Sequence, residues 1–262
     1  MDITGISTVR EYLRCATQLY AHGWAERNGG NISMLMDDDF SGCKVLRRIP
    51  LSFAPGNMAG RCVLITGSGK YLKNVEIDPE SNVALLRIRE DHAEFLWGLR
   101  DGGSPSSELA AHLLSHSSRL AAAPTHRVVM HTHATNAVAM TFVHSLDERE
   151  FTRTLWSMAT ESIMFFHDGI AVLPWMPCGT DDIGRATAEK MKDRRVVVWA
   201  HHGVFGAGSS PDETLGLIET VDKAAQLYMM TAHLPVKQKI NDSQLREMAA
   251  VLGITPHEGY LE

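Results

Sequence analysis

The chain has 262 residues, of which 44% are hydrophobic and 21% are charged, with a formal net charge of −6. This composition is that of an ordinary soluble globular protein and excludes disordered, collagen-like and low-complexity classes. No basic stripe indicates nucleic acid and no polybasic segment indicates a membrane surface, so the expected partner is a small molecule.

Glycine-rich turns separate the elements predicted for the first part of the chain. Apolar side chains at helical spacing predict a helix over residues 6–24, which ends near Gly23. The segment Asn28 to Asn31 is expected to be a turn with positive φ at a glycine. The next expected elements are, in chain order, a short strand over 32–36, an irregular stretch over 37–60, a buried strand over 62–66, a glycine-rich loop over 66–70 and a strand over 82–88.

Helices and strands then alternate to the end of the chain. Serines at 104, 106 and 107 precede an apolar-periodic stretch, so a serine is expected to cap a helix whose first turn contains Glu108. The later elements are a strand over 128–133, helices near 142 and over 151–160, strands over 163–166 and 170–173, a helix over 181–192, a strand over 196–201 and a helix over 211–232. Without repeats or a linker, this order predicts an α/β fold: a single domain over 1–262, in three layers, with a central β-sheet flanked by helices.

The chain shows no targeting signal that we recognise. Its first ten residues lack a basic start followed by an apolar run, and no stretch reaches the roughly 20 apolar residues of a spanning helix. We therefore expect a cytoplasmic location. The four cysteines are far apart and form no CxxC pair, so free thiols are expected. The thirteen histidines are more informative, because several are clustered.

One histidine pair, His131 and His133, lies at the end of the apolar strand that begins at Val128. Side chains at positions i and i+2 of a strand project to the same face, so these two imidazoles can bind one metal ion. The pair alone is not specific, since histidines also serve as polar groups near sheet edges. A metal site therefore needs a third ligand.

A second pair, His201 and His202, precedes Gly203 at the end of another apolar strand. Adjacent strand residues face opposite sides, so only one of the two can join the first pair. We choose His202, although a shift of one residue would transfer the role to His201. Three imidazoles would leave one position of a tetrahedral zinc open, as in catalytic sites. The other histidines are expected to be surface or capping groups: His22, His92, His112, His116, His126, His144, His167 and His233.

Glu108 and three polar loops complete the candidate site. At a helix start the dipole favours an ionised Glu108, which could act beside the metal; the alternative is an ordinary first-turn glutamate. The loops Gly30-Asn31, Ser68-Gly69 and Ser106-Ser107 offer backbone N–H groups and side-chain donors, and together they could bind a phosphate. Each alone would be a routine turn or cap. The loop over 66–70 lacks both P-loop spacing and a full GxGxxG pattern, so nucleotide binding is not supported.

The order of these motifs resembles the class II aldolase and epimerase family, and the resemblance covers most of the chain. The segments that carry it are Asn28-Gly29-Gly30-Asn31, Ile65 to Lys70, Ser106-Ser107-Glu108, His131 to Asn136 and His202-Gly203. It implies an aldolase that cleaves a sugar phosphate to dihydroxyacetone phosphate and an aldehyde. It also implies one Zn²⁺ per subunit, held by His131, His133 and His202, which would stabilise the enediolate left by cleavage.

The resemblance implies further roles. Glu108 would alternate between ligating zinc and transferring a proton at the dihydroxyacetone-phosphate carbon. Glu161 would handle the proton of the aldehyde oxygen from a neighbouring subunit, so that active sites would lie at the interfaces of a cyclic homotetramer. The remaining matched positions are those near the substrate oxygens and the phosphate: Asn28, Gly30, Asn31, Ser68, Gly69, Ser106 and Ser107.

Three other functions remain open from the residues alone. An epimerase of the same fold would re-form the broken bond before an aldehyde is released. A zinc hydrolase would use Glu108 to activate water and would release phosphate or a hydrolysed ester. A noncatalytic scaffold would hold a fully coordinated metal and show no turnover.

Overall fold

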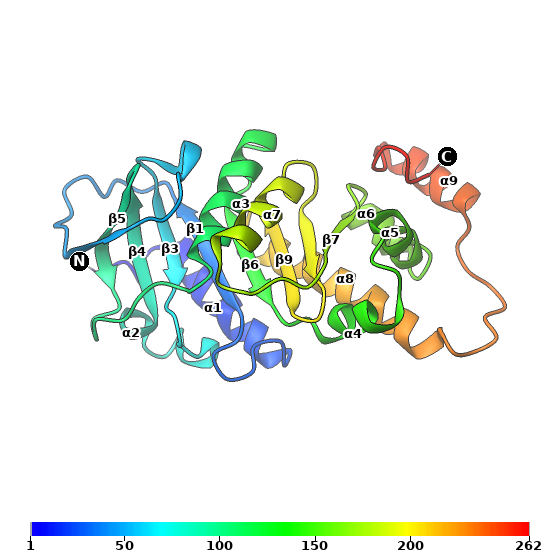
Figure 1. Ribbon diagram of the computed structural model, residues 1–262, viewed down its shortest axis with the longest axis horizontal. Coiled ribbons are helices and arrows are strands. Elements are labelled where there is room, and N and C mark those ends of the chain that lie inside the picture. The colour runs from blue at the N-terminus through cyan, green and yellow to red at the C-terminus, as the bar shows by residue number, and fades with distance from the viewer. Residues whose placement is uncertain (1, 262) are drawn as a thin grey trace.

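The computed structural model describes residues 2–261, and in this range the fold centres on one nine-stranded mixed sheet with the order β2-β5-β4-β3-β1-β6-β9-β8-β7 (Figure 1). The strands are β1 (Asn31–Met36), β2 (Arg47–Pro50), β3 (Cys62–Thr66), β4 (Val83–Ile88), β5 (His92–Gly98), β6 (Val128–Thr132), β7 (Ile170–Leu173), β8 (Val196–Trp199) and β9 (Gly203–Gly208). Neighbouring strands are antiparallel except for β7 and β8, which are parallel. The predicted α/β class with a central sheet is confirmed.

Helices cover both faces of this sheet. They are α1 (Ser7–Ala21), α2 (Pro79–Asn82), α3 (Leu109–Ala122), α4 (Thr135–Val143), α5 (Glu148–Trp156), α6 (Thr160–Phe165), α7 (Asp181–Lys190), α8 (Pro211–Thr231) and α9 (Asp242–Leu252), with short 3₁₀ turns at Gly56–Met58 and Leu72–Asn74. The larger core cluster joins one sheet face to α1, α4, α5 and α8, whereas α3 and α7 pack on the other face. The three layers follow from these two apolar interfaces.

The alternation of side chains along β6 decides which face carries the candidate site. Val128 and Met130 belong to the larger core cluster, whereas Val129 faces the α3 and α7 side. His131, two residues after Val129, therefore points to the α3 side. Its ring packs there against Phe205, with 4.7 Å between ring centroids.

Several predicted elements are confirmed with small changes at their ends. The helix predicted over 6–24 is α1, the strand over 62–66 is β3, and Gly30 has the expected positive φ of 71°. The strand predicted over 82–88 begins one residue later, because Asn82 ends α2. No disulfide bond joins any of the four cysteines, all of which the structure describes, and no described helix is long and apolar enough to cross a membrane.

Three predictions of local structure were wrong. The apolar run 163–166, predicted as a strand, instead forms the end of α6 and the residue that follows it, because Ile163 and Phe166 are three residues apart and both enter the core. The strand predicted over 196–201 ends at Trp199, because the chain then turns: the His202 N–H donates to the Trp199 carbonyl (3.0 Å), and His201 has a φ of 64°. The helix predicted after the serines starts at Leu109, so Glu108 precedes its first turn, without a serine side chain capping it.

Other elements lie where no strand or helix was predicted. The stretch 37–60 contains β2, and β5, β9 and α9 also had no sequence prediction. In β9 the glycines at 203, 206 and 208 hid the strand, because glycine normally weakens strand formation. All three are closely packed: a Cβ on Gly206 would lie 2.8 Å from Ile218 and one on Gly208 would lie 2.7 Å from Thr214, both in α8, while one on Gly203 would lie 2.7 Å from the Thr132 carbonyl.

Candidate active site

Three imidazoles meet on the α3 side of the sheet. His131, His133 and His202 each offer one nitrogen, and these nitrogens all lie within 4.8 Å of one another. Their ring centroids are 4.9 to 5.4 Å apart. Imidazoles at this spacing can converge on one cation, so the structure brings together the three residues chosen from the sequence.

Backbone geometry explains how distant segments reach this point. His131 and His133 leave the end of β6, and His202 lies in the turn between β8 and β9, next to β6 in the sheet. Glycine makes room for the rings: a Cβ on Gly29 would lie 2.8 Å from His133 Cε1, and one on Gly203 would lie 2.6 Å from His131 Cε1. Side chains at these positions would displace the imidazoles.

His131 is buried, and only one of its two ring nitrogens has a hydrogen-bond partner among the described residues. The residue is 1% exposed, and its Nδ1 lies 3.3 Å from the Val204 carbonyl, which can only accept a hydrogen bond. The proton is therefore on Nδ1, and Nε2 presents a lone pair. This Nε2 is buried and has no hydrogen-bond partner among residues 2–261. Since buried polar atoms normally have partners, the unpaired Nε2 fits a metal ligand.

His133 is oriented by an acidic residue. Its Nδ1 lies 2.7 Å from the Glu26 carboxylate, so Nδ1–H donates to Glu26 and Nε2 is left free for a cation. A carboxylate behind a ligating histidine fixes the ring and raises its basicity. Nothing in the sequence pattern indicated Glu26, because it lies 107 positions before His133 and on an exposed turn.

The surroundings favour neutral imidazoles. Burial holds the pKa of His131 well below its ordinary value, and the neighbouring His202 and His133 lower it further. Burial also lowers the pKa of His202 to about 4, with a further contribution from His133. Since only a neutral imidazole can donate a lone pair, these two groups stay available to a cation over the whole physiological pH range.

Glu108 lies beside the histidines. Its Oε2 is 3.7 Å from His131 Nε2, and the residue is buried. Burial raises the pKa of Glu108, while a hydrogen bond of 2.8 Å donated by Asn31 Nδ2 acts in the opposite direction. The Ser106 hydroxyl accepts from the Glu108 N–H at 3.2 Å and so shapes the turn before α3. A carboxyl with a raised pKa beside a cation site is suited to proton transfer.

Two of the predicted phosphate loops are joined directly. The Gly67 and Pro105 backbones form an antiparallel bridge, and the Ser68 N–H donates to the Ser104 carbonyl (2.8 Å). The Ser106 N–H donates to the Thr66 carbonyl (2.9 Å), so the two loops are one structural unit. Ser68, Gly69 and Ser107 are exposed on it, and phosphate binding by these residues stays a prediction.

Other predicted residues are placed differently. Asn28 is exposed on the turn before β1, near the histidine site through its neighbour Gly29. Asn31 has both ends of its amide occupied, by Glu108 and by His112. Glu161 is exposed on α6, beyond the β7 edge of the sheet in Figure 1, and makes no hydrogen bond or ion pair with another described residue. One chain does not bring Glu161 to the histidines.

Two histidines set aside in the sequence are not surface groups. His112 and His116 are both fully buried, on the face of α3 that meets β1. The expectation that they serve as surface or capping groups was wrong, because the side of α3 that carries them packs against β1. Asp222 was also missed: its carboxylate accepts from the backbone N–H groups of Asn136 and Ala137 and so holds the start of α4 just after His133.

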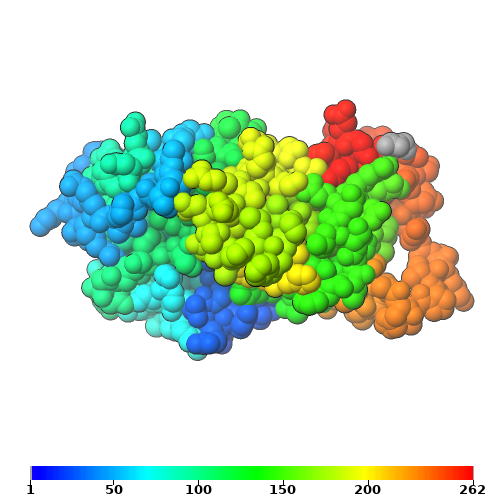
Figure 2. Space-filling view, viewed as in Figure 1, coloured from blue at the N-terminus to red at the C-terminus, as the bar shows by residue number. Residues whose placement is uncertain are grey.

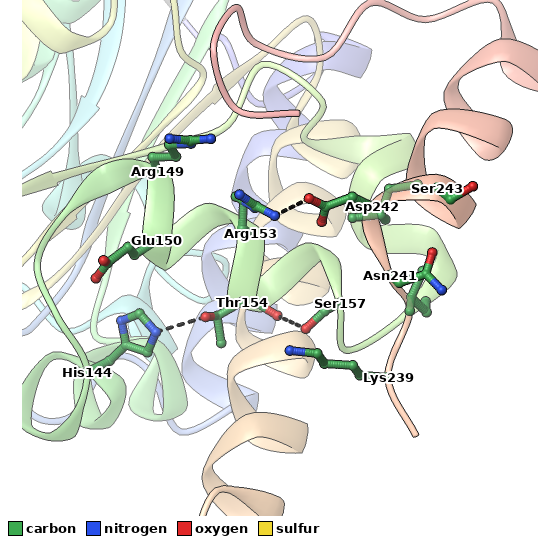
Figure 3. A pocket seen from close by; sticks show the side chains of 12 residues that line it. His144, Arg149, Glu150, Arg153, Thr154, Ser157, Lys239, Asn241, Asp242 and Ser243 are labelled. Atoms are coloured by element: carbon green, nitrogen blue, oxygen red, sulfur yellow. Dashed lines mark hydrogen bonds and ion pairs between the residues drawn. The ribbon is translucent and has the colours of Figure 1, made fainter. Parts of the chain in front are cut away.

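One hollow lies away from these residues. It encloses about 850 Å³ between α5 and the segment that leads into α9. Figure 3 shows that some of its polar side chains pair with one another: Arg153 with Asp242, and His144 Nε2 with the Thr154 hydroxyl, the latter at 2.8 Å. In the space-filling view the same segment stands out from the body beyond α8 (Figure 2). This hollow is an open groove, so we assign the active site to the group of three histidines instead.

Comparison with known proteins agrees with this geometry. Residues 10–229 match the family described as the class II aldolase and adducin N-terminal domain. A rhamnulose-1-phosphate aldolase from Listeria innocua is 47% identical over 99% of this chain and 98% of its own length. Proteins of the same name from Enterococcus faecalis and Escherichia coli are 46% and 42% identical, over 100% and 97% of this chain and 97% of each of those proteins.

Solved structures share the fold. A sugar-phosphate aldolase from Thermotoga maritima superposes with a TM-score of 0.78 at 28% identity, covering 88% of this chain and 97% of that one. An L-fuculose 1-phosphate aldolase superposes with a TM-score of 0.66 over 95% of this chain and 98% of that one. At 18% identity this second likeness concerns the fold alone.

Substitutions at the adjacent histidines test which one is a metal ligand. His202→Asn removes a nitrogen from the group of three, so we expect purified protein to lose most of its bound metal. His201→Asn is the matched control: His201 is exposed, has a positive φ that asparagine tolerates, and lies outside the group. The measurement is metal per subunit by plasma mass spectrometry after dialysis. Equal metal content in the two variants, or loss only in His201→Asn, would contradict the assignment.

Proposed function

The chain belongs to the class II aldolase family, and on this basis we propose that it reversibly cleaves L-rhamnulose 1-phosphate to dihydroxyacetone phosphate and L-lactaldehyde. The observation that carries the proposal is the convergence of His131, His133 and His202 beside a buried carboxylate. Similarity at 42 to 48% over nearly full length to proteins named rhamnulose-1-phosphate aldolase supports the substrate.

The residues fit a divalent cation. His131, His133 and His202 would hold it through their free ring nitrogens, with Glu108 close enough to join or leave the ligand set. We propose zinc, one per subunit, since three neutral imidazoles with an open position are its usual catalytic ligands. When bound, the cation would act as a Lewis acid and would stabilise the negative charge that cleavage leaves on the dihydroxyacetone phosphate fragment.

Glu108 moves the proton at the reacting carbon in this proposal. Cleavage of the C–C bond leaves that carbon of dihydroxyacetone phosphate with an electron pair, and a protonated Glu108 delivers a proton to it. In the reverse direction the Glu108 carboxylate removes the same proton. Because burial raises the pKa of Glu108, its protonated form is easier to reach than that of an ordinary glutamate, as a proton donor requires.

The joined loops position the phosphate. Gly30, Asn31, Ser68, Gly69, Ser106 and Ser107 are the residues that we propose for this contact. Backbone N–H groups and hydroxyls bind a phosphate without a fixed cation nearby, and Lys70 is already paired with Asp101. Tight positioning of the phosphate fixes the distance between the ketose and Glu108. Asn28 lies on the adjoining turn, where we propose that it contacts the sugar oxygens.

We propose that Glu161 reaches the site of a neighbouring subunit, where its carboxylate accepts the proton of the hydroxyl group that becomes the aldehyde oxygen. It is exposed and separated from the histidines of its own chain, while its helix also exposes Phe165, which is 50% accessible. Phe142 and Trp175 are 68% and 66% accessible, and large exposed apolar side chains commonly mark subunit contacts. A cyclic homotetramer in the cytoplasm, with one site at each interface, completes the proposal.

An assay for dihydroxyacetone phosphate tests the function. Coupled to NADH oxidation, the metal-loaded protein should cleave L-rhamnulose 1-phosphate with a kcat/KM at least about tenfold above that for L-fuculose 1-phosphate or L-ribulose phosphate. Chelation should abolish turnover. Glu108→Gln should keep its metal but lose about 100-fold or more in kcat, because it cannot transfer the proton.

Other products would identify other functions. Conversion of the sugar phosphate without a trapped aldehyde would indicate an epimerase, and release of inorganic phosphate would indicate a hydrolase. Either result, or full activity in the chelated protein, would contradict the proposal.

Mixed assemblies test the role of Glu161. Glu108→Gln and Glu161→Gln proteins should each be nearly inactive. In a cyclic tetramer refolded from equal amounts, about one quarter of the sites combine a native Glu108 with a native Glu161 from the neighbour. We therefore expect about one quarter of the native specific activity. If both groups act within one chain, mixing will restore nothing.

A further inference from the structure

A continuous line of polar side chains runs from Glu108 into the interior between α3 and β1. Its members lie in hydrogen-bond contact, one with the next: Glu108, Asn31, His112, Ser33 and His116. The proposed reaction uses Glu108, yet it leaves three of these buried groups without a function. Such a line is costly unless every partner is satisfied.

The line follows from two sequence periods. Glu108, His112 and His116 are four residues apart, which places them along one side of a helix at its N-terminal end. Asn31 and Ser33 are two residues apart in β1 and so project to the same sheet face. Where α3 packs on β1, the strand residues fit between successive helix residues.

The Asn31 amide gives the line its direction. An ionised Glu108 can only accept, so Asn31 must turn its NH₂ group toward it, at 2.8 Å. The Asn31 Oδ1 then faces His112 Nε2 and needs a donor there. His112 must therefore carry its proton on Nε2, and its Nδ1 becomes an acceptor.

The next two bonds continue in the same sense. His112 Nδ1 accepts from the Ser33 hydroxyl at 2.6 Å, so the Ser33 proton is committed to that bond. The Ser33 oxygen can then only accept from His116 Nε2, at 2.8 Å. His116 Nδ1 is then left without a proton, and no described residue forms a hydrogen bond with it. Each group in the line has one arrangement of protons that satisfies its neighbour.

Neutral imidazoles are required for this arrangement. Burial lowers the pKa of His112 to about 3 and holds that of His116 well below its ordinary value. Reversal of the line would turn the Asn31 Oδ1 toward the Glu108 carboxylate, where two acceptors would face each other. The orientation of the Asn31 amide beside Glu108 therefore depends on the proton positions of His112, Ser33 and His116.

We propose that His112, Ser33 and His116 are positioning residues that hold the Asn31 amide in one orientation and thereby fix the place of the Glu108 carboxylate. The consequence for turnover rests on the proposed aldolase function, whereas the proton arrangement does not. None of the three contacts the substrate. A displacement of about 1 Å at a reacting group can cost about 100-fold in rate, so the positioning matters for catalysis.

Neutron diffraction from the deuterated, metal-loaded protein tests the arrangement directly. We expect deuterium on Nε2 of His112 and of His116, and none on the Nδ1 of either ring. The Ser33 deuteron should point to His112 Nδ1. Deuterium on His112 Nδ1, or a doubly deuterated His112, would overturn the inference whatever the enzyme catalyses.

Two variants of His112 separate positioning from packing. The side-chain amide of His112→Gln can reach the place of Nε2 and donate to Asn31, whereas that of His112→Asn reaches only the place of Nδ1. His112→Asn should lose about 30- to 100-fold in kcat with KM within about threefold and metal content unchanged. Exchange of deuterium from D₂O into dihydroxyacetone phosphate, without aldehyde, should fall by the same factor. His112→Gln should recover most of both rates.

Matched serine variants control for the loss of a buried hydroxyl. Ser33→Ala breaks the line and should slow the exchange by about tenfold or more. Ser115→Ala removes a hydroxyl from α3 that is equally buried but has no partner, and should leave the rate unchanged. Equal rates in the two serine variants, or in the two His112 variants, would overturn the positioning role. If the native protein neither cleaves nor exchanges, the proposed function fails and the neutron result alone decides.

Discussion

The proposed metal site depends on one atom, the buried Nε2 of His131, which forms no hydrogen bond with any described residue. Its Nδ1 is committed to the Val204 carbonyl, and burial keeps the ring neutral, so the Nε2 lone pair has no hydrogen-bond partner among the described residues. His133 and His202 direct their own nitrogens to the same place. A buried polar atom without a partner destabilises a fold by about 1–3 kcal/mol. A bound cation would give this nitrogen a partner and would thereby remove the destabilisation.

The sheet and α3 each supply part of the site. The sheet positions the three imidazoles, because β6 and β9 are neighbours in the sheet and the turn from β8 leads into β9. The helix α3 supplies Glu108 at its start, and His112 and His116 below it on the same side. Because Asn31 extends from β1 to both Glu108 and His112, the acid is tied to the same sheet that carries the metal ligands. The three imidazoles and the Glu108 carboxylate are thereby fixed relative to one another.

Local patterns predicted the elements with strong periodicity and the residues at their ends. The apolar runs ending at His131 and Trp199 indicated strands, and the paired histidines after them indicated the metal group. His202 was chosen for the wrong reason: it lies in a turn, not on a strand face. Glu26 could not be found, since only tertiary structure brings it to His133. The spacing of Glu108, His112 and His116 was visible, but only packing against β1 shows that their side is buried.

The most direct test of this account is the position of the cation itself. Diffraction data collected on both sides of the zinc absorption edge, from crystals of the purified protein, should show one anomalous peak per subunit. We expect it about 2.0–2.1 Å from one ring nitrogen each of His131, His133 and His202. A peak bound by His201, a peak at any other group of side chains, or no peak in active protein would contradict the central claim.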